Sequence, residues 1–235
     1  MEPRKHQHAK KRVMIATSGG KDATLALYRL RHDEAYRDQY EAVGLMTTFN
    51  ANTHRSTAHG IRLEVMQAQA KALRLPLEVI WLYQPRGHSY ADYDRQVGKC
   101  YSRLKEQGID CVMYGDIHLE DVKSYRDQLN EKYGVTGIYP LWGDHPEHIL
   151  EQFLDLGYRT VIVAVDTTRL DASYLGQEIT SELLDTLPPQ VDRCAEYGEF
   201  HTFCMDGPMF TESVQLTKGK VTSDGRNCYV DLMLS

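Results

Sequence analysis

Short apolar runs alternate with amphipathic segments along the first half of the chain. Val13–Thr17 is one such run; it ends in a Ser-Gly-Gly turn, and apolar residues then recur at helical spacing. Further apolar runs lie at 42–49, 77–82 and 111–116, and helical patterns cover about 58–73 and 90–107. This order predicts four successive units of a strand followed by a helix.

The predicted strands are apolar almost throughout, which is typical of strands that are covered on both faces. A parallel sheet with helices on both sides follows from that pattern. Because ligands bind at the carboxyl ends of the strands in such sheets, we expect functional residues directly after each strand. Those segments are 18–22, 47–54, 83–88 and 115–121.

The pattern changes after residue 140. A helix over about 146–156 and a strand at Thr160–Val165 are followed, beyond Pro188 and Pro189, by strand-like pieces separated by glycine turns. These pieces are Phe200–Cys204, Val214–Thr217, Val221 and Tyr229–Leu234. The glycine-containing segments 218–220 and 223–226 predict hairpin loops.

We therefore predict an α/β fold in two domains. Residues 13–140 would form a five-stranded parallel sheet with helices on both faces, and residues 141–235 a smaller α+β domain on the substrate side. The basic segment 1–12 would be a flexible tail. A chain of 235 residues is long enough for this division.

Composition narrows the class of protein. The chain is 42% hydrophobic and 26% charged, as in ordinary globular proteins, and contains no apolar run near the ~20 residues of a membrane span. No apolar stretch follows the basic N-terminus, so we expect a cytoplasmic protein with no membrane partner. Five cysteines without a C-x-x-C spacing argue against a zinc ribbon or a dithiol centre.

The charge is unevenly distributed. Residues 1–12 hold five Lys or Arg and one acidic residue, Glu2, which gives them a charge of +4. Because the net charge of the whole chain is −6, residues 13–235 carry −10. An acidic body suits a polyanion poorly, because nucleic acids are bound through many phosphate contacts. We expect no direct binding of nucleic acid.

The turn Ser18-Gly19-Gly20-Lys21-Asp22 lies between the first predicted strand and helix. Glycines let backbone N–H groups approach a ligand closely, and the helix N-terminus and Lys21 add positive charge, which together favour a phosphate. The turn differs from a Walker A loop, which needs an earlier glycine and a Ser or Thr after the lysine. A plain strand-to-helix turn is the alternative.

With Lys21 and Asp22 in place, this turn resembles the SGGKDS signature of the PP-loop ATP pyrophosphatases, with Ala23 in the place of the last serine. The resemblance implies that ATP binds here. The ATP-binding residues that it implies are Thr17, Ser18, Gly19, Gly20, Lys21, Asp22, Ala23, Thr47 and Gly115.

Two later segments narrow the resemblance. Gly115-Asp116-Ile117 is followed by Pro140-Leu141-Trp142, and Asp192–Phe203 leads into Asp206–Phe210. With the glycine turn, these segments are similar in order and spacing to the diphthine-ammonia ligase family over about residues 13–210. One departure is Ala195, which stands where the family has a glycine between cysteine and glutamate.

The same residues suggest acid–base chemistry on their own. Glu199 and His201 are two apart, so on a strand both would face one side, with Glu196 folded toward them by a Gly198 turn. A carboxylate beside an imidazole can bind ammonium or move a proton. A solvated surface turn is the alternative. Asp116, after the fourth strand, would position Mg²⁺ or an amine.

The resemblance implies an ATP-dependent, amide-forming ligase that adenylates a carboxylate and transfers ammonia to it, releasing AMP and pyrophosphate. Its catalytic residues would be Lys21, Asp116, Glu196, Glu199 and His201, and the substrate would contact Glu196, Glu199, His201 and Thr202. Mg²⁺ would arrive with ATP, and Cys194, His201 and Cys204 offer too few ligands for a resident metal.

The sequence leaves two acceptors possible, diphthine on elongation factor 2 and a small-molecule carboxylate. It also leaves a homodimer possible as the oligomeric state. A tRNA-modifying PP-loop enzyme and a non-catalytic nucleotide sensor are the rival functions. The acidic body and the scattered cysteines disfavour the first rival. The presence of Glu196, Glu199 and His201 disfavours the second.

Overall fold

The computed structural model describes residues 9–83 and 90–235. The predicted tail, up to residue 8, and most of the segment 83–88 after the third predicted strand lie outside the described residues, whereas Lys11 and Arg12 already belong to the first strand. The first sheet has the strand order β4-β2-β1-β5-β6, all parallel. Its strands are β1 (Lys11–Ala16), β2 (Tyr40–Asn50), β4 (Leu77–Leu82), β5 (Cys111–Met113) and β6 (Thr136–Ile138). The predicted five-stranded parallel sheet is confirmed.

The short strand β3 (Arg55–Ser56) pairs antiparallel with the end of β2 and adds a sixth strand to this sheet. It lies in the segment that follows β2 and pairs alongside Phe49 and Asn50, the last residues of that strand. The sequence pattern contained no signal for a strand of two residues.

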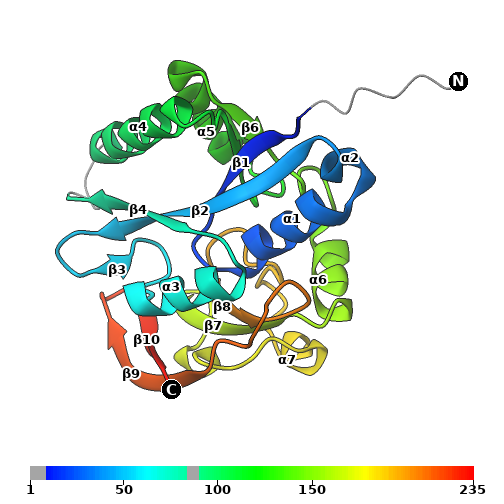
Figure 1. Cartoon of the computed structure of the whole chain (residues 1–235). Helices are drawn as coiled ribbons and strands as arrows, with labels where there is room; N and C mark the ends of the chain where they lie inside the picture. Colours follow the sequence, from blue (N-terminus) through cyan, green and yellow to red (C-terminus); the bar gives the residue numbers. More distant parts are fainter. Residues whose placement is uncertain (1–8, 84–89) are drawn as a thin grey trace, which may run out of the picture.

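Helices cover both faces of the parallel sheet, as expected from strands that are apolar on both sides (Figure 1). Along β1, Met14 packs with α4 (Ala91–Glu106) and α5 (Glu120–Tyr133), whereas Val13 and Ile15 pack with α1 (Lys21–His32). The remaining helices are α2 (Glu34–Arg37), α3 (Leu63–Ala72), α6 (Pro146–Asp155), α7 (Ser181–Asp185) and the 3₁₀ turn η1 (Ala172–Tyr174).

The second sheet is antiparallel and has the order β8-β7-β10-β9. Its strands are β7 (Arg159–Asp166), β8 (Phe200–Asp206), β9 (Leu216–Ser223) and β10 (Asn227–Leu234). The loop 223–226 joins β9 to β10, which confirms one predicted hairpin.

The second predicted hairpin loop, at 218–220, is wrong. Lys218 and Val221 pair with Leu232 and Val230 of β10, so Gly219 and Lys220 face one residue, Asp231, across a β-bulge. The glycine accommodates this irregularity within one continuous strand rather than ending it.

Strand β8 fastens the second sheet to the glycine turn before α1. The Cys204 N–H donates to the Gly19 carbonyl at 2.8 Å, and the Gln69 side-chain amide donates to the carbonyl oxygens of Gly19 and Cys204 at 2.9 and 2.6 Å. One apolar cluster includes Ile15 from β1 and Phe200 from β8. The two sheets therefore share a core beside the turn.

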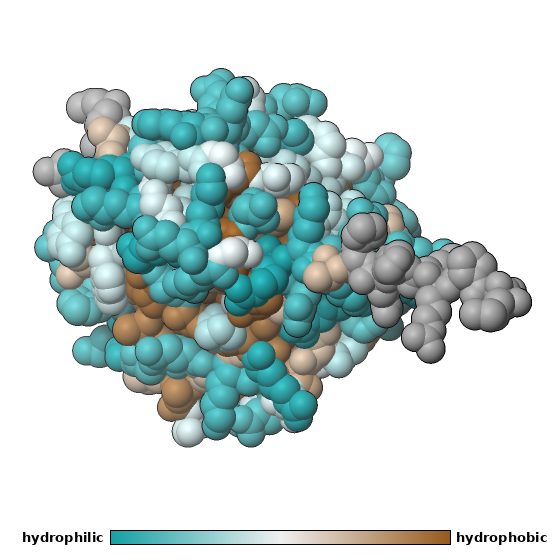
Figure 2. Space-filling model, turned by 45° about the horizontal axis from the view of Figure 1, so that its top comes forward, coloured by the Kyte–Doolittle hydropathy of each residue, from teal (hydrophilic) through white to brown (hydrophobic). Residues whose placement is uncertain are grey.

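Most of the surface seen in Figure 2 is polar, and apolar residues show mainly in the depressions between polar side chains. Within residues 9–83 and 90–235, no helix has the length and apolar character that crossing a membrane requires.

Candidate functional site

A cavity of about 420 Å³ lies at the carboxyl ends of the parallel strands. Its walls come from the glycine turn, from the segments after β2 and β5, and from the loop 192–198 with the start of β8. It brings together most of the residues that the sequence singled out: Thr17, Ser18, Gly20, Lys21, Asp22, Ala23, Thr47, Gly115, Asp116, Glu196, His201 and Thr202.

Gly19 does not line the cavity, because it serves the turn itself. Its φ is +87°, a conformation that favours glycine, and a Cβ there would lie 2.8 Å from the ring of Phe203. Its N–H donates to the Thr17 hydroxyl at 2.9 Å. The turn therefore holds the other loop residues in place while its own glycine packs against β8.

Helix α1 starts at the cavity without a side-chain cap of its own, since its N-cap residue is Gly20. The hydroxyl of Thr202 instead accepts the Lys21 N–H at 3.2 Å. A helix N-terminus carries a partial positive charge and favours anions. The predicted substrate contact Thr202 thus has a structural task, shaping the anion-binding end of α1.

Lys21 is buried and joins two walls of the cavity. Its ammonium group lies 2.8 Å from Asp22 Oδ1 and 2.5 Å from the carbonyl oxygen of Cys194. Burial lowers the pKa of Lys21, but the charge and hydrogen bond of Asp22, together with the charges of Cys194 and Glu196, outweigh it and raise the pKa. Lys21 therefore stays charged and faces both the turn and the loop 192–198.

Asp116 forms an ion pair with Arg126 of α5. Nε and Nη2 of Arg126 lie 2.6 and 3.2 Å from the two carboxylate oxygens, and the guanidinium sits 4.6 Å above the ring of Tyr114. Arg126 also lines the cavity. Arg126 was not among the predicted site residues, although it lies only ten positions after Asp116 in the sequence.

Glu196 carries the most perturbed carboxyl group of the cavity. Burial, reinforced by the negative charge of Asp22, Asp192 and Asp116, raises its pKa to about 8. The Asp192 carboxylate accepts the Glu196 and Cys194 N–H groups at 3.0 Å each. This loop therefore presents a carboxyl group that gains and loses a proton near neutral pH.

Ala195, next to Glu196, has a φ of +58°. An L-residue in this left-handed conformation costs about 1–2 kcal/mol. The sequence resemblance had marked this position as a departure from a glycine, and the conformation gives the physical reason for glycine there. The chain accepts the strain and keeps the loop closed around Lys21.

His201 lies beside His59, with the ring centroids 4.6 Å apart. Nδ1 of His59 lies 2.8 Å from the Thr202 carbonyl. Burial and the neighbouring Lys21 lower the pKa of His201 to about 4, and burial, reinforced by His201, holds the pKa of His59 well below its ordinary value. Both imidazoles are therefore uncharged at neutral pH.

Glu199 is not brought to the cavity, and the expectation that it would face the same side as His201 is wrong. It precedes β8, so the alternation of a strand does not apply to it. Its Oε1 lies 3.5 Å from Arg169 Nη1 and accepts the Asp192 N–H at 3.4 Å. Glu199 therefore helps to hold the loop 192–198 in place through its hydrogen bond with the Asp192 N–H.

The doubly wound parallel sheet, with its cavity at the carboxyl strand ends, places this chain in the α/β class of ligand-binding proteins. Models of the diphthamide synthase N-terminal and C-terminal domains match residues 11–137 and 145–233. The chain belongs to the diphthamide synthase family.

A diphthine–ammonia ligase of Schizosaccharomyces pombe is 25% identical over 111 residues, a match that covers 44% of this chain and 18% of that protein. The chain thus matches about a fifth of the length of this relative.

Two solved structures show weaker likeness. A predicted subunit of a tRNA methyltransferase from Methanocaldococcus jannaschii is 13% identical, with a TM-score of 0.44 over 84% of this chain and 98% of its own. A U34-tRNA thiolase from Methanococcus maripaludis is 17% identical, with a TM-score of 0.39 over 66% of this chain and 60% of its own.

Proposed function

We propose that this protein is an ATP-dependent ligase that joins ammonia to a carboxylate in an amide bond. The observation that supports this most is the position of Lys21, whose buried ammonium group touches both the glycine turn and the loop that carries Glu196. A phosphate-binding turn and an acid–base carboxyl group thus share one cavity.

The nucleotide would lie along the glycine turn. Thr17, Ser18, Gly20 and Ala23 would face its phosphates, and Thr47 its adenosine. Gly115 packs against the start of α1 so closely that a Cβ there would lie 2.6 Å from the Ala23 nitrogen. This contact fixes the width of the cavity at the first turn of α1.

Mg²⁺ would accompany the nucleotide, and the donor set of the cavity fits it. Mg²⁺ is usually held by one or two carboxylates together with phosphate oxygens and water. Both oxygens of Asp22 accept from Lys21 and both oxygens of Asp116 face Arg126, but the side chain of Asp22 is the more exposed of the two, 28% against 15%. Asp22 would hold the ion, and the ion would neutralise charge on the phosphates.

In the first step, an oxygen of the acceptor carboxylate forms a bond to the α-phosphorus, and the bond to pyrophosphate breaks. Lys21 and the N-terminus of α1 would stabilise the charge that develops on the leaving pyrophosphate. A preorganised donor of this kind contributes about 2.7–4 kcal/mol.

In the second step, the nitrogen of ammonia forms a bond to the acyl carbon, and AMP leaves with its bonding electron pair. Glu196, with a pKa of about 8, would take the proton that the nitrogen loses. The uncharged His201 would hydrogen-bond the acceptor without repelling ammonium. Glu199 would act as a positioning residue through the Asp192 N–H.

For the acceptor we propose diphthine, carried by elongation factor 2. This rests on the family and on the name of the relative from Schizosaccharomyces pombe.

The test is product analysis with ATP, Mg²⁺, ammonium and elongation factor 2 that carries diphthine. We expect continued release of AMP and pyrophosphate only when both ammonium and the acceptor are present, and at most one turnover of pyrophosphate release with the acceptor alone. Formation of ADP, or AMP formation that depends on neither, would contradict the proposal.

A further inference from the structure

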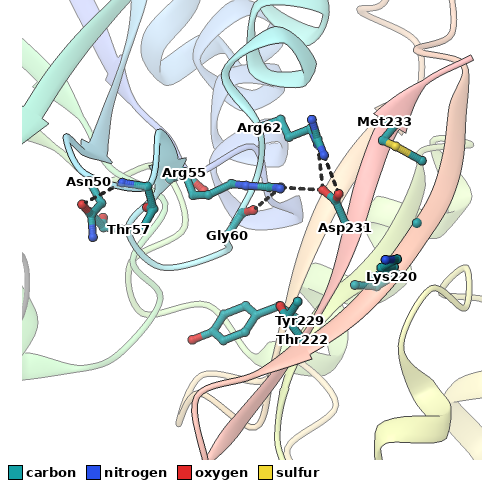
Figure 3. A pocket seen from close by; sticks show the side chains of 14 residues that line it. Asn50, Arg55, Thr57, Gly60, Arg62, Lys220, Thr222, Tyr229, Asp231 and Met233 are labelled. Carbon is teal, nitrogen blue, oxygen red and sulfur yellow. Dashed lines mark hydrogen bonds and ion pairs between the residues drawn. The ribbon is translucent and has the colours of Figure 1, made fainter.

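A second, larger hollow opens beside the cavity. This groove of about 820 Å³ lies between the segment 50–62 and the face of strands β9 and β10 (Figure 3). Ser56 and Thr57 line both the groove and the cavity. The groove therefore extends the cavity toward strands β9 and β10 of the second sheet. The proposed two-step reaction assigns no function to the groove.

The groove is cationic in an acidic protein. Arg55 and Arg62 converge on Asp231, with N···O distances of 2.5 and 2.7 Å (Figure 3). The two guanidinium groups hold the pKa of Asp231 well below its ordinary value, so it stays charged and the trio carries +1. Lys220 is exposed, and no carboxylate of the described residues lies within ion-pair distance of it.

The rest of the groove is largely apolar or weakly polar, from Tyr229, Val230 and Met233 of β10. The ring of Tyr229 packs against Gly60, where a Cβ would lie 3.1 Å away, and its hydroxyl donates to Asp224 at 3.3 Å. This ring is half-buried. Arg62 also pairs with Glu64, so the groove offers few cations for successive phosphates.

We propose that this groove binds an acidic peptide segment of the protein that carries the acceptor carboxylate. The inference rests on the proposed function and names the part of that function which recognises the substrate. Its volume, about twice that of the cavity, exceeds what a reacting carboxylate side chain fills. Lys220 supplies the complementary positive charge, Arg55 and Arg62 supply guanidinium N–H donors, and Met233 supplies an apolar contact for side chains.

The test measures binding of a fluorescein-labelled oligoglutamate peptide by fluorescence anisotropy, with an oligoglutamine peptide for comparison. Lys220→Glu reverses an exposed charge in the groove, and Thr222→Trp fills it with a bulky side chain on an exposed strand position. Lys218→Glu makes the same charge change on β9 outside the groove lining.

We expect the wild-type protein and Lys218→Glu to bind oligoglutamate equally, and Lys220→Glu and Thr222→Trp to bind it about tenfold more weakly. Equal binding by all four proteins, or tighter binding of tRNA that displaces the peptide from the groove, would overturn the proposal. So would sedimentation showing that a second copy of the chain fills the groove.

A separate measurement keeps this result distinct from the proposed reaction. ATP binding, followed by equilibrium dialysis, should be the same in all four proteins, because the groove variants lie outside the nucleotide end of the cavity. Peptide binding without ATP binding would contradict the proposed ligase function and still support the proposal that the groove binds an acidic peptide. ATP binding without groove-dependent peptide binding would do the reverse.

Discussion

The ammonium group of Lys21 donates a hydrogen bond of 2.5 Å to the backbone carbonyl oxygen of Cys194, a residue 173 positions later in the chain. One side chain thus ties the turn before α1 to the loop that holds Glu196. A phosphate entering the turn would compete with Asp22 and Cys194 for this ammonium group. On the proposed function, nucleotide binding would therefore be coupled to the position of the loop 192–198.

Replacing Lys21 removes the central cation of the cavity. For Lys21→Met we expect AMP formation to fall by about 10²–10³-fold, because the charge on the leaving pyrophosphate loses a preorganised donor. Lys71→Met is the matched control, since Lys71 is an exposed lysine of α3 whose side chain is 81% exposed. If Lys21→Met forms AMP as fast as the control Lys71→Met, Lys21 has no role in the reaction.

Ionisation of Glu196 should appear in the pH dependence of amide formation. With a pKa of about 8, its carboxyl group becomes an available base as the pH rises, so the rate of the ammonia step, measured at a constant concentration of free ammonia, should increase through that pH. In Glu196→Gln we expect this increase to vanish and the rate to fall by about 10²–10⁴-fold. Glu212→Gln, at an exposed glutamate, should keep the wild-type profile.

The same pKa shift affects stability. A carboxyl group whose pKa is raised by folding favours the folded state less as the pH rises from its ordinary value of 4.5 to about 8. The wild-type free energy of unfolding should therefore decline across that range relative to Glu196→Gln, and the difference should level off above it. Urea unfolding at several pH values measures this, and parallel curves for the two proteins would contradict the shift.

The left-handed conformation of Ala195 predicts a stabilising substitution. Ala195→Gly relieves the steric cost of φ +58° and loses some chain entropy, so we expect the free energy of unfolding to rise by about 0.5–1 kcal/mol. Ala172→Gly in the 3₁₀ turn η1 should instead destabilise the protein. Equal losses in urea unfolding for both variants would show that Ala195 carries no strain.

Gly115 sets the width of the cavity. In Gly115→Ala the new methyl group would lie 2.6 Å from the Ala23 nitrogen and 2.8 Å from the Asp22 carbonyl carbon, and both are backbone atoms. We expect a loss of about 1–3 kcal/mol in stability together with weaker ATP binding. Gly157→Ala meets no atom within 4 Å, so its backbone strain at φ +76° should reduce stability alone. Unchanged ATP affinity in Gly115→Ala, measured by calorimetry, would contradict the tight contact.

The parallel sheet could be predicted because its strands are apolar almost throughout and each is followed by a segment with the periodicity of a helix. The second sheet was harder. Gly219 resembles a turn residue in the sequence, but the bulge opposite Asp231 is set by pairing with β10, which lies later in the chain. Local composition cannot distinguish a bulge from a hairpin, because the difference arises from the partner strand.

The position of the cavity could be predicted from the glycine turn and from the segments that follow the strands. The alternation of strands and helices is enough to bring those segments to one edge of the parallel sheet. The partners of the predicted residues needed the tertiary structure. Arg126 reaches Asp116 from α5, and His59 reaches His201 from the segment after β3. Glu199 was misplaced because the alternation of a strand was applied to it, although both the predicted strand and β8 begin at the next residue, Phe200.

The most direct test of the central claim follows the oxygen atoms of the acceptor. Elongation factor 2 carrying diphthine, labelled with oxygen-18 in the reacting carboxylate, would be turned over with ATP, Mg²⁺ and ammonium. Attack of that carboxylate on the α-phosphorus predicts that the label appears in the AMP that is released. AMP without label, or release of ADP, would contradict adenylation of a carboxylate in this cavity.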